Sequence, residues 1–240
     1  MKTFDFFGIT FPLDLDEGTY GTCKLLLRPG TFWVIKTFKH TLTDLFREVR
    51  ALVMTQGPGI QKIVGVCSHK KVLVTEFAGP TVDYLVEKKM VDHKKATQIL
   101  EGVLEVLVNV HQRNYSHNDI KMNNICLQDT VYGQTKVTLI DFGLSCDKRE
   151  ENSFTTVPGD NGFRGWIAPE FCQTGGSEAT DVYSVGYLAT RILPGGTWQY
   201  LYPSELKLWV KEAQSHEASR RPSLEQGLKA ARRALTQLHQ

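Results

Sequence analysis

The chain has 240 residues, of which 41% are apolar and 22% charged, a composition typical of a globular protein with one ordinary domain or two small lobes. A formal charge of +2 does not indicate a nucleic-acid partner, and no apolar run approaches the roughly 18 residues that a membrane span needs. Five cysteines without a repeated spacing indicate free thiols in a reducing compartment, so we expect an intracellular protein, cytoplasmic or nuclear.

Residues 13 to 36 are predicted to form β-structure. Gly18 and Gly21 lie where a hairpin would turn, and the lack of a Cβ allows the backbone there to approach phosphate groups closely. An ordinary glycine-containing hairpin explains the same pattern. The β-rich run that begins at Thr31 ends at Lys36, which this pattern alone describes as a solvated strand end.

Residues 43 to 54 are predicted to form an amphipathic helix. The apolar residues at helical spacing are Leu45, Val49, Leu52 and Val53. Glu48 falls within this apolar stripe, where a buried carboxylate without a partner would be costly. Either a cation pairs with Glu48, or Glu48 reaches solvent at the edge of the stripe.

Residues 60 to 67 and 71 to 77 are predicted to form two further strands, and Gly79-Pro80 then breaks the chain. The pattern becomes helical after this break. One long helix is expected to bury the face formed by Ile99, Val103, Val106, Leu107 and Val110.

Polar residues cluster around a predicted hairpin in the middle of the chain. Its strands are residues 125 to 127 and residues 137 to 140. Asp119 and Asn124 precede the first strand and Asp141 follows the second, so the hairpin would bring these side chains together. Phosphoryl transfer needs a carboxylate that orients a hydroxyl and oxygen ligands for Mg²⁺, and this cluster offers both.

Three later segments carry structural expectations. Residues 144 to 165 are polar and rich in glycine, which is typical of a mobile segment. Residues 181 to 188 are apolar on nearly all sides and predict a buried central helix. Ser223 and Gln226 form a capping box for the last helix, whose predicted apolar face consists of Leu224, Leu228, Ala231, Leu235 and Leu238.

Three motifs together resemble the catalytic domain of eukaryotic-type protein kinases. Residues 117 to 124 read His-Asn-Asp-Ile-Lys-Met-Asn-Asn, residues 141 to 143 read Asp-Phe-Gly, and residues 168 to 170 read Ala-Pro-Glu, in the order of the family. The resemblance covers about residues 15 to 226 and points to a minimal Ser/Thr kinase whose catalytic loop lacks the usual arginine.

The resemblance implies an α+β, bilobal protein-kinase-like fold in a single domain, residues 1–240. A small β-rich N-lobe would occupy about residues 13–78 and a mainly helical C-lobe about residues 79–240. Asp181 would hold the backbone of the catalytic loop, and Arg221 would pair with Glu170.

The resemblance also implies catalytic roles. Asp119 would orient the acceptor hydroxyl and accept its proton, and Lys121 would stabilise the charge of the transferring phosphoryl group. Asn124 and Asp141 would bind Mg²⁺, and Lys36, held by Glu48, would position ATP. Lys121 in this loop favours serine and threonine over tyrosine as acceptors.

The implied ATP pocket draws mainly on the N-lobe. Thr75 would be the gatekeeper behind adenine, and the backbone of Glu76 and Ala78 would bind the adenine ring. The full set expected around ATP is Gly18, Gly21, Cys23, Val34, Lys36, Glu48, Thr75, Glu76 and Ala78.

The sequence departs from the family pattern at three positions. Asp16 replaces the first glycine of the glycine-rich hairpin, Asn118 replaces the arginine before the catalytic aspartate, and Phe163 stands where Ser/Thr kinases usually have a threonine. These departures leave open a pseudokinase or decoy that binds a kinase partner or regulator without catalysis. A small-molecule phosphotransferase is disfavoured by the Ala-Pro-Glu motif and the long segment before it.

Asn118 also bears on regulation. In many kinases the arginine at this position pairs with a phosphate on the activation segment, and a phosphate orders a loop only where a cation receives it. Asn118 has no charge, so we expect activity that does not depend on phosphorylation of Ser153, Thr155 or Thr156. The expected partners are a protein substrate and a protein regulator, and the small size suits a virus acting inside a host cell.

Overall fold

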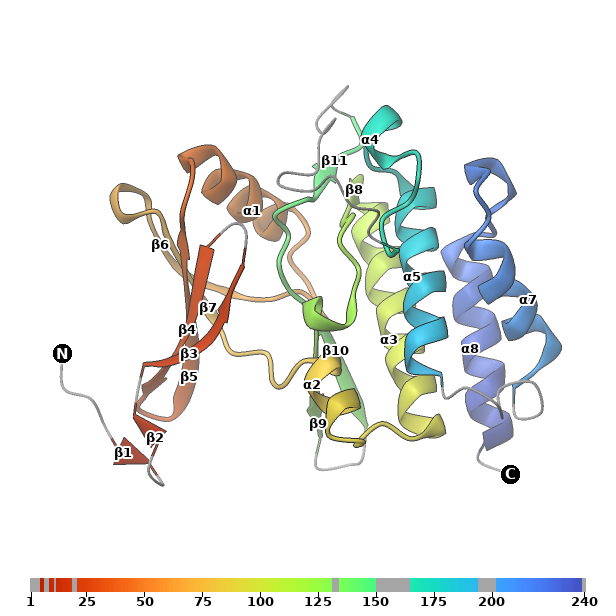
Figure 1. The fold of residues 1–240 in the computed structure, drawn as a ribbon, viewed down its shortest axis with the longest axis horizontal. Coiled ribbons are helices and arrows are strands. Elements are labelled where there is room, and N and C mark those ends of the chain that lie inside the picture. Colours follow the sequence, from red (N-terminus) through yellow and green to blue (C-terminus); the bar gives the residue numbers. More distant parts are fainter. Residues whose placement is uncertain are drawn as a thin grey trace.

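The computed structural model describes residues 5–6, 9–10, 12–18, 21–130, 134–149, 165–193 and 202–238. Within these residues a small antiparallel sheet with one helix beside it adjoins a larger part built mainly from helices (Figure 1). The bilobal α+β fold expected from the sequence is therefore confirmed.

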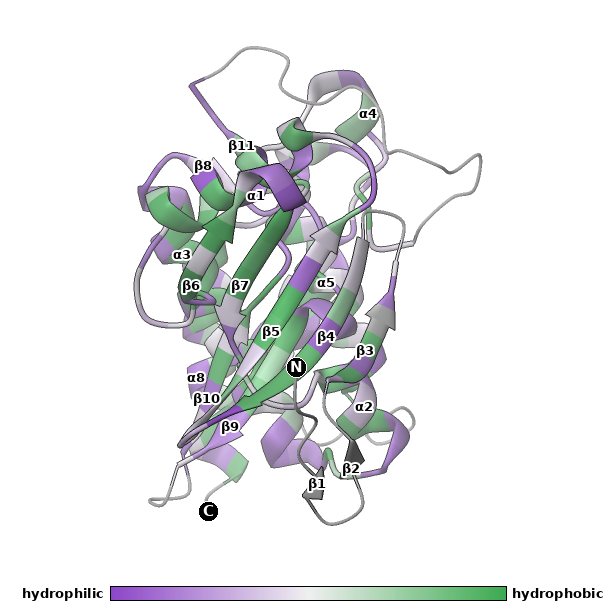
Figure 2. Cartoon of the chain, turned by 90° about the vertical axis from the view of Figure 1, so that its left-hand side faces the viewer, coloured by the Kyte–Doolittle hydropathy of each residue, from purple (hydrophilic) through white to green (hydrophobic). Residues whose placement is uncertain are grey.

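Five strands form the N-terminal sheet in the order β3-β4-β5-β7-β6, and every neighbouring pair is antiparallel. Figure 2 shows this sheet face-on. The strands are β3 Leu13–Glu17, β4 Gly21–Arg28, β5 Thr31–Phe38, β6 Ile63–Cys67 and β7 Val72–Glu76. A separate ribbon pairs β1, Asp5–Phe6, with β2, Ile9–Thr10. The β-structure expected between residues 13 and 36, and the two later strands, are thus present.

Helix α1, Leu42–Met54, packs against this sheet. Thr41 and Asp44 form a capping box at its start, because the side chain of each accepts a hydrogen bond from the backbone N–H of the other. Its buried residues are Leu45, Glu48, Ala51 and Leu52. The expectation that Val53 belongs to the apolar stripe is wrong: Val53 is 56% exposed, because Ala51 fills the inward position beside Leu52.

Two buried helices, α3 and α5, form the centre of the larger part. Helix α3, His93–Gln112, buries the apolar face expected from its sequence, and α5, Glu178–Ile192, is the expected central helix. Helix α8 packs on α3, and α7 contacts both α5 and α8. No described helix combines the length and the apolar content that crossing a bilayer requires. The other helical elements are α2 Val82–Glu87, α4 Phe171–Thr174, α7 Ser204–Ala213 and α8 Leu224–Leu238, with 3-10 turns at Ser68–Lys70, Met122–Asn124 and Ala218–Arg220.

Helix α8 packs mainly through small residues, which confirms Leu224 and Ala231 of the predicted apolar face and corrects the rest of it. Its buried residues are Leu224, Gly227, Ala230, Ala231 and Ala234, whereas Leu228, Leu235 and Leu238 are only partly buried. A Cβ on Gly227 would lie 2.5 Å from the ring of Trp209 on α7, so only glycine fits there. The capping box of Ser223 and Gln226 is present as predicted.

A hairpin lies between the sheet and the helices (Figure 1). Strand β9, Ile125–Asp129, pairs with β10, Thr135–Leu139, close to the bounds that the sequence predicted. The backbone of Leu139 also accepts a hydrogen bond from Gln61 and donates one to Gly59, so the hairpin is tied to the segment that leads into β6. A separate short pair is formed by β8, Tyr115–Ser116, and β11, Cys146–Asp147.

Asp181 on α5 holds the loop that precedes this hairpin. Its carboxylate is fully buried and accepts hydrogen bonds from the backbone N–H of His117 at 2.8 Å and of Asn118 at 2.7 Å. The ring of His111, at the end of α3, lies 2.7 Å from the same carboxylate. The arrangement confirms the expectation that Asp181 fixes this loop.

A second buried ion pair joins the segment just before α8, which carries Arg221, to the segment just before α4, which carries Glu170. Arg221 contacts both carboxylate oxygens of Glu170, at 2.6 and 2.8 Å, and the guanidinium lies 5.0 Å from the ring of Tyr183. The pair expected from the sequence is therefore present, in the bidentate geometry that arginine favours.

The contacts of His111 change its protonation. Burial acts to lower the pKa of His111, but the carboxylates of Asp181 and Glu178 outweigh burial and raise it above the usual value of 6.5. Burial acts to raise the pKa of Asp181, and His111 with the loop donors outweighs that and lowers it. Lys148 also faces His111 and weakly opposes its charge. The folded protein thus binds a proton at His111 more tightly than the unfolded chain does.

This shift predicts a pH-dependent stability. Because the folded-state pKa of His111 is raised, its contribution is fully present below the unfolded value near 6.5 and is lost as pH rises through the raised value. We expect His111→Gln to lower the free energy of unfolding at about pH 6 more than at about pH 9. Urea unfolding of both proteins at the two pH values measures this. A deficit in the variant that does not change with pH would contradict it.

Candidate active site

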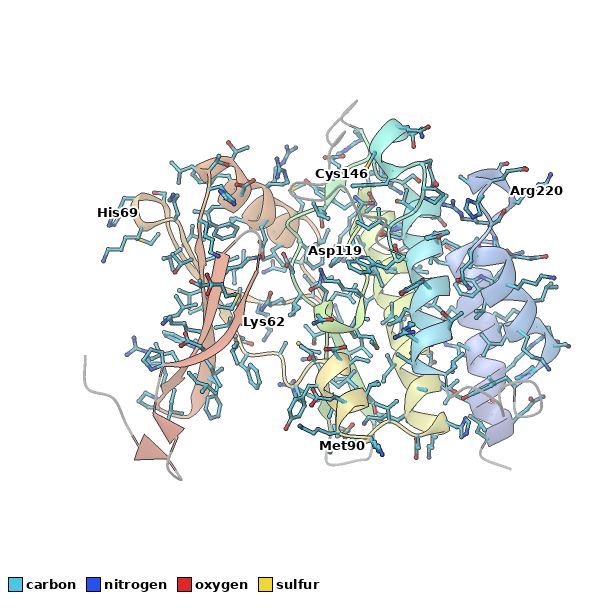
Figure 3. All side chains as sticks on the ribbon, in the orientation of Figure 1. Lys62, His69, Met90, Asp119, Cys146 and Arg220 are labelled. Carbon is cyan, nitrogen blue, oxygen red and sulfur yellow. The ribbon has the colours of Figure 1, made fainter. Side chains whose placement is uncertain are left out.

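A cavity of about 760 Å³ lies between the sheet and the helical part, a size typical of small-molecule sites. Figure 3 shows Asp119 between the N-terminal sheet and helix α5. The predicted residues that line the cavity are Gly18, Gly21, Cys23, Val34, Lys36, Glu48, Thr75, Ala78, Asp119, Lys121, Asn124 and Asp141. The structure therefore brings all but one of the predicted site residues together, while their roles stay predictions.

Lys36 on β5 lies between two carboxylates. Its Nζ is 2.7 Å from Glu48 Oε2 on α1 and 2.8 Å from Asp141 Oδ1 after β10. The ion pair with Glu48 was expected, and the second contact was not. The side chain of Glu48 is 2% exposed and that of Asp141 is 32% exposed, so Asp141 is the carboxylate more accessible from the cavity.

Burial and charge compete within this group of three. Burial acts against the charge of Lys36, but the two carboxylates outweigh it and raise the pKa of the ammonium. Burial raises the pKa of Glu48 to about 7, although Lys36 opposes that rise. For Asp141 burial also acts upward, and Lys36 outweighs it and lowers the pKa. Two carboxylates share one ammonium, and the more deeply buried Glu48 is less favoured as an anion.

Three donors converge on the carboxylate of Asp119. Lys121 Nζ and Asn124 Nδ2 each lie 2.8 Å from Oδ2. The indole Nε1 of Trp166 lies 2.8 Å from Oδ1. The contacts to Lys121 and Asn124 follow from the short loop that holds all three residues. Sequence reasoning missed Trp166, whose only signal was its position just before the Ala-Pro-Glu motif.

Asn124 and Asp141 carry the chemistry of magnesium ligands. Asn124 donates through its amide nitrogen to the backbone oxygen and the carboxylate of Asp119, so these two contacts do not use its amide oxygen. Amide and carboxylate oxygens are the donors that Mg²⁺ prefers, so these residues fit that ion. Among the described residues no cluster of three His, Cys, Asp or Glu side chains forms a metal centre elsewhere.

The back and edge of the cavity are formed by β7 and the segment that follows it. The hydroxyl of Thr75 accepts a hydrogen bond of 2.9 Å from Gln61 Nε2. Glu76 is the predicted residue that does not line the cavity: its exposed side chain pairs with Lys62 at 3.3 Å. Binding of adenine by the backbone of Glu76 and Ala78 stays a prediction.

The two glycines of the β3–β4 hairpin differ. A Cβ on Gly21 would lie 2.3 Å from the backbone oxygen of Thr37 on β5, so the sheet itself requires glycine there. A Cβ on Gly18 would meet nothing within 4 Å. Gly21 is therefore explained by strand packing without any ligand, whereas Gly18 is not. The residues between them, and the side chain of Asp16, lie outside the described part of the structure.

Asn118 fills a closed, uncharged socket. Its backbone has φ of 65°, a conformation that asparagine tolerates well. Its Nδ2 lies 3.0 Å from the backbone oxygen of Leu144, and its Oδ1 accepts a hydrogen bond of 2.9 Å from Thr180. A Cβ on Gly176 would lie 2.2 Å from Nδ2, so the socket is tight. Ser153, Thr155, Thr156 and Phe163 lie outside the described residues.

Comparison with known proteins agrees with this geometry. A family model described as the protein kinase domain matches residues 14–229. Ribosomal protein S6 kinase 2 alpha of Xenopus laevis is 27% identical over 188 residues, which are 75% of this chain and 25% of that protein. Ribosomal protein S6 kinase alpha-3 of Homo sapiens is 26% identical over 192 residues, which are 77% of this chain and 26% of that protein.

The chain thus spans about a quarter of the length of the curated relatives it matches. The family match covers the sheet, the cavity and the helical part together, and the catalytic-loop, Asp-Phe-Gly and Ala-Pro-Glu segments all fall within it. The chain belongs to the protein kinase domain family.

Proposed function

We propose that the chain transfers the γ-phosphate of ATP to serine and threonine hydroxyls of proteins, with Mg²⁺ as cofactor. The observation that carries this proposal is the convergence on one cavity of the Lys36–Glu48 ion pair and the hydrogen-bonded Asp119 cluster. A protein that only binds a partner needs neither feature. The Ser/Thr preference is supported by Lys121 and by the similarity to the S6 kinases.

Each residue acts through its charge or its hydrogen bonds. Asp119 orients the acceptor hydroxyl and takes its proton as the bond to phosphorus forms. Lys121, already paired with Asp119 Oδ2, stabilises the charge on the phosphoryl oxygens. Lys36 contacts the α- and β-phosphates and keeps its place through Glu48. Positioning and electrostatic stabilisation supply most of the rate in phosphoryl transfer.

Magnesium would be held by the amide oxygen of Asn124 and the carboxylate of Asp141. When bound, Mg²⁺ neutralises charge on the phosphate oxygens. Asp141 also forms an ion pair with Lys36. The proposed ligand of Mg²⁺ is therefore in direct contact with the proposed ligand of the phosphates.

Transfer of labelled phosphate from ATP and Mg²⁺ to protein substrates tests the proposal. We expect Asp119→Asn, which keeps the shape of the side chain and removes its basicity, to reduce the rate by about 10²- to 10⁴-fold. Melting temperatures of both proteins show whether the variant stays folded. Equal and low labelling by the two proteins would instead support the non-catalytic binder.

Asp141→Asn tests the proposed role of Asp141 in binding Mg²⁺ separately from its contribution to the stability of the fold. The folded protein stabilises the charge of Asp141 through Lys36, so we expect the variant without ligand to melt at a somewhat lower temperature than the wild type. A ligand raises stability only by binding the folded state, so the extra stabilisation by ATP that depends on Mg²⁺ should disappear. Thermal melting with ATP, with and without Mg²⁺, measures this. A shift equal to that of the wild type would refute the ligand role.

Independence from activation-segment phosphorylation is a further part of the proposal. The socket of Asn118 supports it, because the position where many kinases carry a phosphate-binding arginine holds a buried amide with partners inside the protein. Asp181 also holds the loop around Asn118, through hydrogen bonds from the loop backbone that need no phosphate.

We therefore expect phosphatase-treated protein, and a variant with Ser153, Thr155 and Thr156 all replaced by alanine, to phosphorylate a separate substrate at nearly the wild-type rate. The untreated protein is the reference, and mass spectrometry confirms the loss of phosphate. A rate loss of more than about tenfold, or ~1.4 kcal/mol in the barrier, would show that a phosphate switch operates.

The proposed setting is the reducing interior of a cell, where ATP is available. The five free cysteines of the chain support this setting, because they form no disulfide.

A further inference from the structure

Trp166 contacts the candidate catalytic carboxylate through its indole N–H. The Nε1 atom lies 2.8 Å from Asp119 Oδ1, although the two residues are 47 positions apart in the chain. The indole nitrogen is only a donor, and a hydrogen bond to a carboxylate is stronger than one between neutral groups. Trp166 thus holds the one carboxylate oxygen of Asp119 that Lys121 and Asn124 do not contact.

The hydrogen bonds of Asp119 leave a defined place for an acceptor hydroxyl. A carboxylate accepts at about four positions, two on each oxygen. Within the described residues, Lys121 and Asn124 donate to Oδ2, and Trp166 donates to Oδ1. One accepting position therefore remains on Oδ1. Because the indole N–H of Trp166 occupies the other, the Trp166 contact determines where on Oδ1 an acceptor hydroxyl can bind.

The same indole supports Lys121. The ammonium of Lys121 lies 5.3 Å from the centre of the Trp166 ring, within the range of a cation–π contact. The edge of the ring thus contacts Asp119 and its face contacts Lys121. These are the residues proposed to handle the proton and the phosphoryl charge.

Helix α5 fixes both Trp166 and the catalytic loop. The buried hydroxyl of Ser184 donates a hydrogen bond of 2.5 Å to the backbone oxygen of Trp166. Asp181, three residues earlier on the same helix, holds the backbone of His117 and Asn118. Residues three apart lie on one helix face, so a single rigid element sets the distance between the indole and Asp119.

We propose that Trp166 is a positioning residue for phosphoryl transfer, which orients the carboxylate of Asp119 and supports the ammonium of Lys121. The kinetic part of this inference rests on the proposed kinase activity. The contact between Trp166 and Asp119 is a separate claim that can be tested in an inactive protein.

Trp166→Phe and Trp209→Phe form a matched pair of variants. Each removes an indole N–H that donates a hydrogen bond of 2.8 or 2.9 Å, and each keeps an aromatic ring. Trp209 donates to the backbone of Ser223, between α7 and α8, and belongs to no part of the proposed site. Loss of one hydrogen bond to a charged group predicts a fall in kcat of about tenfold or more in Trp166→Phe. The KM for ATP should not change, because Trp166 does not line the cavity.

Indole N–H signals in a ¹⁵N–¹H spectrum report the contact without any need for activity. We expect Asp119→Asn to move the signal of Trp166, which loses a charged acceptor, and to leave that of Trp209 in place. A Trp166 signal that does not move, or a kcat for Trp166→Phe equal to that of Trp209→Phe, would overturn the proposal. An inactive wild type with a Trp166 signal that does respond would refute the proposed function and leave only a structural contact.

Discussion

The buried carboxylate of Asp181 is the contact on which the rest of the site depends. A charge inside a helical core is tolerated only where donors surround it, and here two backbone N–H groups and the ring of His111 do so. Those backbone groups belong to the loop that carries Asp119, so the burial of one charge determines the position of another. Helix α5 also anchors Trp166 through Ser184. The same helix therefore positions both the loop that carries Asp119 and the indole that contacts the Asp119 carboxylate.

The second organising interaction is the sharing of Lys36 by Glu48 and Asp141. One ammonium cannot neutralise the buried Glu48 and the more exposed Asp141 equally, and burial raises the pKa of Glu48 to about 7. A cation bound by Asp141 would reduce its demand on Lys36 and favour the ion pair with Glu48. Through this competition, a cation in the cavity would affect α1, the helix that carries Glu48 and packs against β5, β6 and β7.

Features that depend on neighbouring residues were predicted well from the sequence, whereas contacts between distant segments were not. The hairpin of β9 and β10 and the buried face of α3 follow from short-range periodicity, and both are present. The inward face of α8 was predicted only in part: Leu224 and Ala231 are buried as expected, but close approach to Trp209 requires glycine at Gly227, which no single-helix pattern reveals. The apolar stripe predicted that Glu48 needs a cation, and the resemblance to protein kinases identified Lys36 as that cation. The Trp166–Asp119 contact was not predictable, because it depends on how α5 places two segments.

The Asn118 socket restricts which sequences this fold can accept. Any side chain at position 176 would displace the amide of Asn118, because a Cβ there would lie 2.2 Å from Nδ2. The hydroxyl of Thr180 contacts the amide oxygen of Asn118 and also the backbone oxygen of Ser177, so it keeps an acceptor if Asn118 changes. The constraint therefore acts on position 176: homologues that carry asparagine at position 118 in this conformation should carry glycine at position 176.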